Sequence, residues 1–310
     1  MAVVIPTRGR ETRLAFALEA LVGQTLEADR FEVHVVRAPD ALEGGLTSAP
    51  PGLDVEFHVA PTAGTAVQRN VGWQASRAPL VAFSDDDCRA SPRWLESMLD
   101  ANQGPRSFLQ GRTEPDPDEN HLNHGLARTI RNVKPSGWYE TCNIAYPRAL
   151  LEQLGGFDEA IEFLGEDADL GARACATGAS LHFVEAALVW HAVHWRSLPT
   201  AIRDAQRRGS RPAIIARHPE LRRALWLGVF TDPDHIRLLL AIAGLAFVRR
   251  KPYLSALAAG PYVKKHFDPT RLTPWGLLRF PMQLSARAVV DSAEVASFAA
   301  SSVRHRTLVL

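Results

Sequence analysis

The sequence predicts an α/β protein with a doubly wound sheet, followed by a helical C-terminal extension. Over the first 90 residues, short apolar runs alternate with amphipathic stretches of helical length, which is typical of a largely parallel sheet covered by helices. Beyond about residue 195 the strand signals end, and stretches rich in Leu, Ala and Arg continue to the C-terminus. We therefore expect an α/β domain over residues 1–195 and a basic helical extension over 196–310.

The strands are predicted from short runs of β-branched and apolar residues. These runs lie at 2–5, 31–36, 54–59, 79–84, 107–113 and 142–147, and in the two segments SLHFV and ALVWH that follow Gly178.

The helices are predicted between these strands. One is expected near 11–23, where Leu14, Leu18 and Leu21 recur at helical spacing, and another near 64–76. Ser91-Pro92 has the residue types of an N-cap and a first helical position, so a third helix should run from there to about residue 101. A fourth should begin at the acidic pair Glu166-Asp167 and stop at Gly178.

Composition excludes several classes of protein. The chain has 310 residues, 46% hydrophobic and 22% charged, which excludes disordered and collagen-like chains. Its three widely spaced cysteines form neither a disulfide framework nor a paired metal motif, and a reducing cytoplasm is expected. The first residues lack the pattern of a signal peptide, and the longest apolar run, Leu238 to Val248, is too short to span a bilayer.

Charge is divided unevenly along the chain. Residues 201–310 contain 18 basic and 7 acidic residues, whereas residues 1–200 contain 17 basic and 27 acidic residues. This division predicts that the two parts meet different partners.

Three adjacent carboxylates, Asp85, Asp86 and Asp87, follow the strand expected at 79–84. Doubly wound sheets bind ligands at the carboxyl ends of their strands. In an extended segment Asp85 and Asp87 share a face, so either could bind a divalent cation, or one could do so through a water. Oxygen ligands favour Mg²⁺ or Mn²⁺. The alternative is a solvated acidic turn before the next helix.

Four separated motifs resemble the family-two glycosyltransferases of the GT-A fold. They are VVIPTRGR at the start, GTAVQRNVGWQASRAPLVAFSDDDC, NIAYPRALLEQLGGFDEA and FLGEDADLGARACATG, in this order. The resemblance extends from about Val3 to His191. It implies a GT-A type mixed sheet, with a nucleotide-sugar half at about 1–90 and an acceptor half at about 91–195.

The resemblance also implies how the donor is bound. Pro6, Thr7, Asp85 and Asp86 would contact the nucleotide sugar, with Asp85 facing the ribose. Asp87 would be the direct ligand of Mn²⁺ or Mg²⁺. Arg69 would offset charge on the departing nucleoside diphosphate; the simpler interpretation is a surface residue of a helix.

By the same resemblance, Glu166-Asp167 is similar to the ED motif of the family. Asp167 would take the proton from the acceptor hydroxyl as it attacks the anomeric carbon opposite the leaving group, which inverts the configuration. We expect the positive end of the helix to keep this carboxylate ionised. The alternative is that Glu166 and Asp167 only favour the helix start, and for Asp169 and Arg173 we predict a simple i,i+4 pair.

Other positions are implied at the metal and acceptor sides. Many family members place a metal-binding histidine where His191 ends ALVWH, and His194 is a near competitor. Trp138, Tyr139 and Asn143 would contact the acceptor or the donor sugar, or equally form part of the core. The polar segment from Glu114 to Gly137 is expected to be a mobile loop that orders over substrate. The aspartate that the family usually has after the second strand is replaced here by Arg37-Ala38-Pro39, which leaves the nucleotide base open.

The resemblance therefore implies an inverting, metal-dependent glycosyltransferase. The chain has no glycine-rich nucleotidyltransferase loop, Walker loop or GxGxxG motif, and no nucleic acid is expected as a partner. The alternative is a non-catalytic protein that uses its basic tail to bind an anionic membrane or nucleic acid.

The basic extension predicts contact with anionic lipid on the inner face of the cell membrane. Its clusters Arg249-Arg250-Lys251 and Lys264-Lys265 would lie near headgroups, with Tyr253, Trp275 or Phe280 at the interface. A lipid-linked or cell-envelope glycan acceptor would follow, whereas a solvated helical cap is the alternative.

Overall fold

The computed structural model describes residues 1–41, 49–161, 164–267 and 273–310, except for the side chain of Trp275. The chain divides into two compact units. Unit 1 comprises Met1–Asn123 and Arg128–His194, and unit 2 comprises His124–Ala127 and Trp195–Leu310. Each unit is described separately below.

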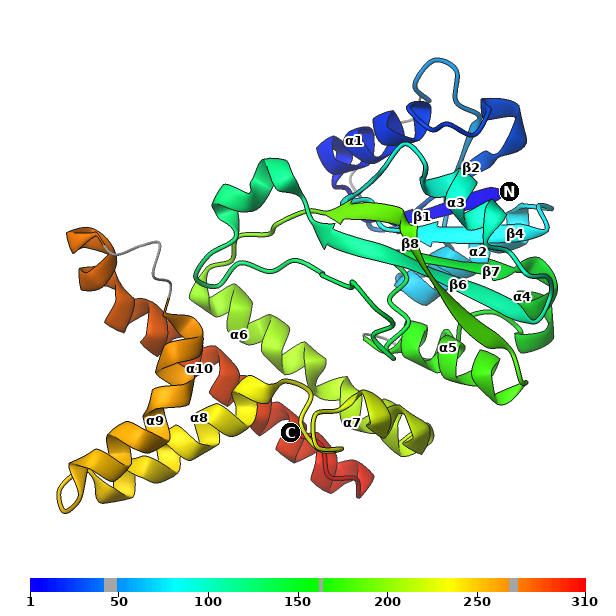
Figure 1. The fold of residues 1–310 in the computed structure, drawn as a ribbon. Coiled ribbons are helices and arrows are strands. Elements are labelled where there is room, and N and C mark those ends of the chain that lie inside the picture. The colour runs from blue at the N-terminus through cyan, green and yellow to red at the C-terminus, as the bar shows by residue number, and fades with distance from the viewer. Residues whose placement is uncertain (42–48, 162–163, 268–272) are drawn as a thin grey trace. The chain divides into compact units, whose positions relative to one another are not determined.

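Unit 1 is built on one mixed sheet of eight strands in the described part of the chain (Figure 1). In chain order the strands are β1 (Ala2–Thr7), β2 (Glu32–Arg37), β3 (Val55–Val59), β4 (Leu80–Ser84), β5 (Cys88–Ala90), β6 (Ser107–Pro115), β7 (Asn143–Pro147) and β8 (Ser180–His191). Their order across the sheet is β3-β2-β1-β4-β7-β6-β8-β5. Strands β3, β2, β1 and β4 are parallel, so the carboxyl ends of β1 and β4 meet at one edge.

Helices cover both faces of this sheet. They are α1 (Glu11–Val22), α2 (Thr65–Ala75), α3 (Trp94–Asp100), α4 (Arg148–Leu154) and α5 (Glu166–Ala176). Leu14 and Leu18 of α1 pack with Val3 and Ile5 of β1 in the main core. On the opposite face, Gly72 allows α2 to lie directly on the sheet, because a Cβ there would come 2.4 Å from the side chain of Val4. Alternate residues of β1 thus serve the two faces.

Two local expectations were wrong. The third helix begins at Trp94, with Arg93 as its N-cap residue, and Ser91 makes no side-chain cap. The segments SLHFV and ALVWH form one strand, β8, rather than two. The break expected near Glu185 is a bulge, where the register with β6 jumps from Val184 to Leu188. Pairing along nearly the whole of β6 keeps the strand continuous across this irregularity.

Unit 2 is helical. Its helices are α6 (Leu198–Arg207), α7 (Arg211–Arg217), α8 (Pro233–Gly244), α9 (Pro252–His266) and α10 (Pro274–His305). A small core joins Ala201 and Ala205 of α6 to Val290 of α10. In its interior Tyr262 Oη donates to Asp291 Oδ2 at 2.8 Å. Among the described residues, no helix has both the length and the apolar character needed to cross a bilayer.

Candidate functional site

The site in unit 1 is organised around the Asp85–Asp87 turn between β4 and β5. Asp86 is 0% exposed, and Thr7 Oγ1, at the end of β1, donates to its Oδ2 at 2.6 Å. Arg10 forms an ion pair with its other oxygen. Burial raises the pKa of Asp86 to about 6, although Arg10 and Thr7 act in the opposite direction. Asp86 therefore ties the turn to the end of β1 instead of facing solvent.

Asp87 lies between two histidines. The Nε2 atom of His194 donates to Asp87 Oδ2 at 2.8 Å, and Nε2 of His191 lies 3.8 Å from Oδ1. Arg10 forms an ion pair with Asp87 as well. Burial disfavours the charged form of Asp87, but the hydrogen bond from His194 and the charges of His191 and Arg10 outweigh it and lower the pKa of this carboxyl.

The surroundings of His191 fit a metal ligand. Its Nδ1 lies 2.8 Å from the carbonyl oxygen of Ala192. Since a carbonyl only accepts, Nδ1 carries a proton, and Nε2, the nitrogen nearer Asp87, is the one that would bind a metal in the neutral imidazole. The ligand atoms of Asp87, Cys88 and His191 all lie within 4.8 Å of one another. A cation that favours oxygen ligands, such as Mn²⁺ or Mg²⁺, would use the carboxylate and the imidazole in preference to the buried thiol.

Asp85 faces away from this cluster and toward Arg69. The guanidinium of Arg69 donates through one nitrogen to Asp85 Oδ1 at 3.0 Å and through the other to Glu166 Oε1 at 2.7 Å. Arg69 is 4% exposed, so the interpretation as a surface helix residue is wrong. Burial opposes its charge, but Asp85, Glu166 and Asp167 together raise its pKa. Arg69 thus links the aspartate turn to the start of α5.

The two acidic residues at the start of α5 differ in their surroundings. Glu166 is 5% exposed, and its Oε1 also accepts from Thr65 Oγ1 at 2.8 Å. Asp167 is half-buried, and its Oδ1 accepts from the backbone N–H of Ala168 at 2.8 Å. Glu166 is therefore fully engaged with protein groups, whereas Asp167 retains access to solvent.

The acidity of Asp167 differs from the expectation for a helix start. Burial, and then the charges of Glu166 and Glu140, raise the pKa of Asp167 well above its ordinary value. Arg69 and the hydrogen bond from Ala168 offset only part of this. Desolvation and like charge thus oppose the ionised form at this helix start. That the positive end of the helix keeps this carboxylate ionised stays a prediction.

The three residues predicted to contact sugars lie in different environments. Asn143 is buried, and its side-chain amide donates to the carbonyls of Arg112 and Ala187 while accepting from Trp94 Nε1. Tyr139 is also buried, packed against α5 where a Cβ on Gly171 would come 2.2 Å from its ring. Trp138 is half-buried. The burial of Asn143 and Tyr139 fits the alternative interpretation, in which they belong to the core and do not contact a sugar.

The segment from Glu114 to Gly137 is anchored at several points within unit 1. Glu119 Oε2 accepts from the backbone N–H of Val193 at 2.7 Å. Thr129 Oγ1 donates to the carbonyl of His191 at 3.1 Å, and Arg128 forms a β-bridge with His194. Residues 124–127 are grouped with unit 2. These anchors hold the segment beside the two histidines.

Sequence reasoning missed Arg10, Thr65 and Glu140. A signal for Arg10 existed, because three adjacent carboxylates require a nearby cation and TRGR follows β1 at the same sheet edge. Thr65 and Glu140 have no comparable local signal. In place of the aspartate that the resemblance led us to expect after β2, Arg37 donates to Glu11 Oε1 at 2.6 Å.

Comparison with known proteins identifies the family. The profile of glycosyl transferase family 2 matches residues 2–156, which include β1, α2 and the aspartate turn. The chain belongs to glycosyltransferase family 2. This confirms the family resemblance, and the mixed sheet with a helical C-terminal region confirms the predicted fold class.

Two related proteins and two solved structures are similar to this family member. It is 28% identical over 218 residues to validoxylamine A glucosyltransferases from Streptomyces hygroscopicus subsp. limoneus and subsp. jinggangensis, covering 57% of this chain and 48% and 52% of theirs. The chain thus spans about half the length of these relatives.

The structural similarity concerns the fold alone. The mannosyltransferase PcManGT from Pyrobaculum calidifontis, solved with GDP-Man and Mn²⁺, matches with a TM-score of 0.56 at 17% identity, covering 98% of this chain and 86% of that one. S. aureus TarS, solved with UDP, matches with a TM-score of 0.50 at 15% identity, covering 99% of this chain and 91% of that one.

Proposed function

We propose that this protein transfers a sugar from a nucleotide-sugar donor to an acceptor hydroxyl, with inversion and with the help of a divalent cation. The observation that carries the proposal is the bridge through Arg69, which joins Asp85 of the aspartate turn to Glu166 of the acidic pair. It brings the predicted donor-binding turn and the predicted base into one constellation. Membership in glycosyltransferase family 2 supports the reaction class.

In this proposal Asp167 is the general base. It accepts the proton of the acceptor hydroxyl while that oxygen attacks the anomeric carbon from the face opposite the leaving diphosphate. Its raised pKa makes its ionised form a stronger base than an ordinary aspartate. Glu166 is a positioning residue, because its contacts with Arg69 and Thr65 hold the start of α5 in place.

The donor is held by the aspartate turn. Asp85 faces the ribose, and Asp86 acts indirectly, because it braces the turn against Thr7 and Arg10. Asp87 and His191 would hold Mn²⁺ or Mg²⁺, with His194 supporting Asp87 through its hydrogen bond. When bound, the cation offsets the negative charge of the departing diphosphate. The Mn²⁺ in PcManGT supports a divalent metal.

Donor turnover tests the proposal. The purified full chain is incubated with UDP-, GDP-, TDP- and CDP-sugars and Mn²⁺, and release of the nucleoside diphosphate is measured. At least one donor should be turned over. Asp167→Asn should slow the release by about 10² or more, while Glu185→Gln, at an exposed carboxylate on β8, leaves it intact. No release from any donor, with or without added glycan acceptors, would favour the non-catalytic alternative.

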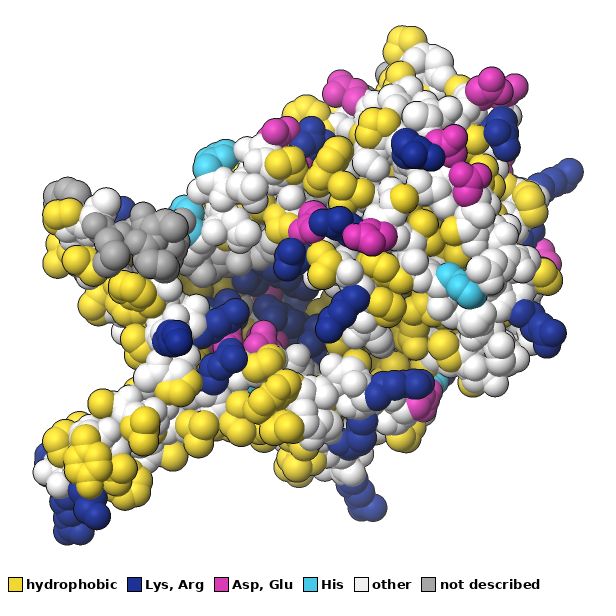
Figure 2. Space-filling view, viewed as in Figure 1, with side chains coloured by type: hydrophobic (Ala, Val, Ile, Leu, Met, Phe, Trp, Pro, Cys, Tyr) yellow, Lys and Arg dark blue, Asp and Glu magenta, His cyan; other side chains and the backbone are white. Residues whose placement is uncertain are grey.

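The acceptor side of the proposal rests on an exposed surface of unit 2. A helical hairpin, formed by α8, the 3-10 helix η5 (Leu245–Phe247) and α9, exposes Leu245, Phe247, Val248, Tyr253 and Leu257. Arg249, Arg250 and Lys251 lie exposed at its tip. Figure 2 shows apolar side chains gathered along this hairpin and basic ones at its end. The side chain of Trp275 lies outside the described residues.

The hairpin tip has the composition of a surface that binds anionic lipid. Apolar side chains enter the boundary between headgroups and acyl chains, and each basic residue near the surface contributes about 1 kcal/mol. We therefore include in the proposal a peripheral position on the inner face of the cell membrane and a lipid-linked or cell-envelope acceptor.

Co-sedimentation with liposomes tests this part. The chain should bind vesicles that contain phosphatidylserine and not neutral ones, and binding should fall at roughly 0.5 M salt because charge is screened. Arg249→Glu/Arg250→Glu should remove binding, whereas Arg203→Glu/Arg304→Glu, an equal charge change at exposed positions of α6 and α10, should weaken it only slightly. Equal loss in both variants would contradict the assignment to the tip.

A further inference from the structure

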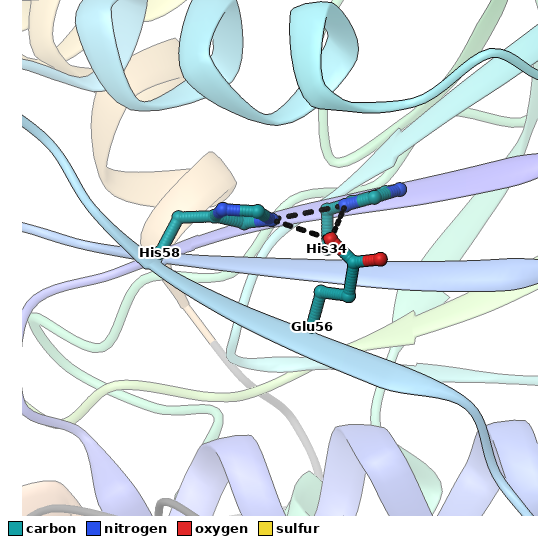
Figure 3. Close-up of side chains that lie close together, drawn as sticks. All are labelled: His34, Glu56 and His58. Atoms are coloured by element: carbon teal, nitrogen blue, oxygen red, sulfur yellow. Dashed lines mark hydrogen bonds and ion pairs between the residues drawn. The ribbon is translucent and has the colours of Figure 1, made fainter.

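A second group of metal-ligand side chains lies at the other end of the sheet, on β2 and the edge strand β3. It consists of His34, Glu56 and His58 (Figure 3). In the parallel register His34 is opposite Glu56, and His58 is opposite Val36. Because alternate residues of a strand share a face, all three side chains project from the same side of the sheet. The aspartate turn and the acidic pair do not include them.

The three ligand atoms are spaced as the ligands of one small cation are. His34 Nδ1 lies 3.0 Å from His58 Nε2, and Glu56 Oε2 lies 3.7 Å from the first and 3.6 Å from the second. A tetrahedral Zn²⁺ with ligands at about 2.0–2.1 Å separates them by about 3.3 Å. The observed triangle therefore approximates one face of such a tetrahedron.

The carboxylate of Glu32 lies next to the buried imidazole of His34, on the side away from Glu56 and His58. His34 is 1% exposed, and its Nε2 lies 3.4 Å from Glu32 Oε1, outside good hydrogen-bonding geometry. Ser76 Oγ donates to the same oxygen of Glu32. With a metal on Nδ1, the proton of His34 must be on Nε2 and points to Glu32. This is the carboxylate–histidine–metal arrangement that orients ligands in zinc sites.

The open side of the triangle faces solvent. Glu56 is the most exposed of the three, with 61% of its side chain accessible, and His58 is partly exposed. An ion can therefore enter from outside and complete its coordination with water. Without an ion, the two imidazoles satisfy each other only when one nitrogen carries a proton and the other does not.

We propose that His34, Glu56 and His58 form a zinc-binding site that clamps the edge strand β3 to β2. Two imidazoles and one carboxylate suit Zn²⁺ better than Mg²⁺, which prefers an all-oxygen shell. The site is separate from Asp87 and His191 and does not depend on the proposed transferase reaction. Its role is structural, because the ion would join two strands whose other contacts are backbone pairing and packing.

Equilibrium dialysis of the metal-free full chain against Zn²⁺, in the presence of excess Mg²⁺, measures this site directly. One Zn²⁺ per chain should remain bound in Asp87→Asn/His191→Ala, which removes two ligands of the other group and so isolates this site. The variant Glu56→Gln/His58→Ala should lower Zn²⁺ affinity at least about 100-fold, since loss of an outer partner alone costs about 10- to 100-fold. The control Glu185→Gln/His305→Ala, at two exposed positions elsewhere, should bind as the wild type does.

Two further measurements define the geometry and the role. Co²⁺ in place of Zn²⁺ should give the intense visible absorption of a four-coordinate ion, and Glu32→Gln should weaken binding about 10-fold while leaving the spectrum in place. Zn²⁺ should raise the melting temperature of the wild type and not that of Glu56→Gln/His58→Ala. Retention of wild-type Zn²⁺ affinity in that variant, or loss of Zn²⁺ only in Asp87→Asn/His191→Ala, would overturn the proposal.

Discussion

Replacement of Arg69 by methionine tests the bridge that holds the site together. Arg69 makes two charge-assisted hydrogen bonds, at 2.7 Å to Glu166 and 3.0 Å to Asp85. Methionine keeps the apolar stem of the side chain but removes the guanidinium group with its positive charge and its hydrogen-bond donors. Glu166, which is 5% exposed, then loses the one oppositely charged partner that it has among the described residues, whereas Asp85 can turn toward water.

The expected loss in the free energy of unfolding follows from this difference between Glu166 and Asp85. Removing one partner of a buried ion pair typically costs about 3–5 kcal/mol, because the other charge remains buried and uncompensated. Thr65 still donates to Glu166, and Asp85 is partly solvated, so we expect a value near the lower limit, about 3 kcal/mol. At about 2–4 °C per kcal/mol for a unit of this size, the melting temperature should fall by roughly 10 °C.

Urea denaturation of the full chain, followed by circular dichroism, measures the change in the free energy of unfolding. Arg77→Met, at an exposed position just after α2, is the matched control and should change stability by less than about 0.5 kcal/mol. Adding Glu166→Leu to Arg69→Met should recover part of the loss, because both members of the pair are then apolar. If Arg69→Met alone is as stable as Arg77→Met, the reasoning is refuted.

The remaining predictions concern the proposed reaction. Asp167→Asn should bind donor as the wild type does, measured by calorimetry, yet lose about 10² or more in rate; free turnover would contradict its role as base. Because Asp167 must be ionised to accept a proton and its pKa is raised, kcat/KM should fall with decreasing pH well above pH 4. Glu140→Gln removes a negative charge that raises the pKa of Asp167, so the fall of kcat/KM on the acidic side should move to lower pH. If that fall stays at the same pH, Glu140 does not act on the pKa of Asp167. Asp87→Ala should abolish metal-dependent activity while the circular dichroism spectrum is kept, and full turnover in excess EDTA would refute the metal requirement. His191→Ala should need more Mn²⁺ for its half-maximal rate. If the Mn²⁺ dependence is unchanged in His191→Ala but shifted in His194→Ala, His194 is the metal ligand instead.

Local sequence patterns determined most of the sheet. The strands β1, β2 and β4 were predictable because buried parallel strands are continuous apolar runs, and the aspartate turn was placed at a sheet edge because it directly follows such a run. The start of α5 was predictable because Gly165 precedes an acidic first turn. These features depend only on neighbouring residues in the chain.

Tertiary structure decided the features that depend on distant residues. Strand β5 has three residues and exists through its pairing with β8, about a hundred residues later in the chain. The same pairing places His191 opposite Cys88, while the bridge from Arg128 brings His194 to Asp87.

The charge state of the site was likewise decided by packing. Arg10 and Arg69 became partners of the aspartate turn, and burial with Glu140 nearby raised the pKa of Asp167 where local sequence favoured an ionised carboxylate. A sequence records which groups can ionise and how they are spaced along the chain. Coulombic and desolvation energies depend on distance and burial in space, and only the folded chain sets those.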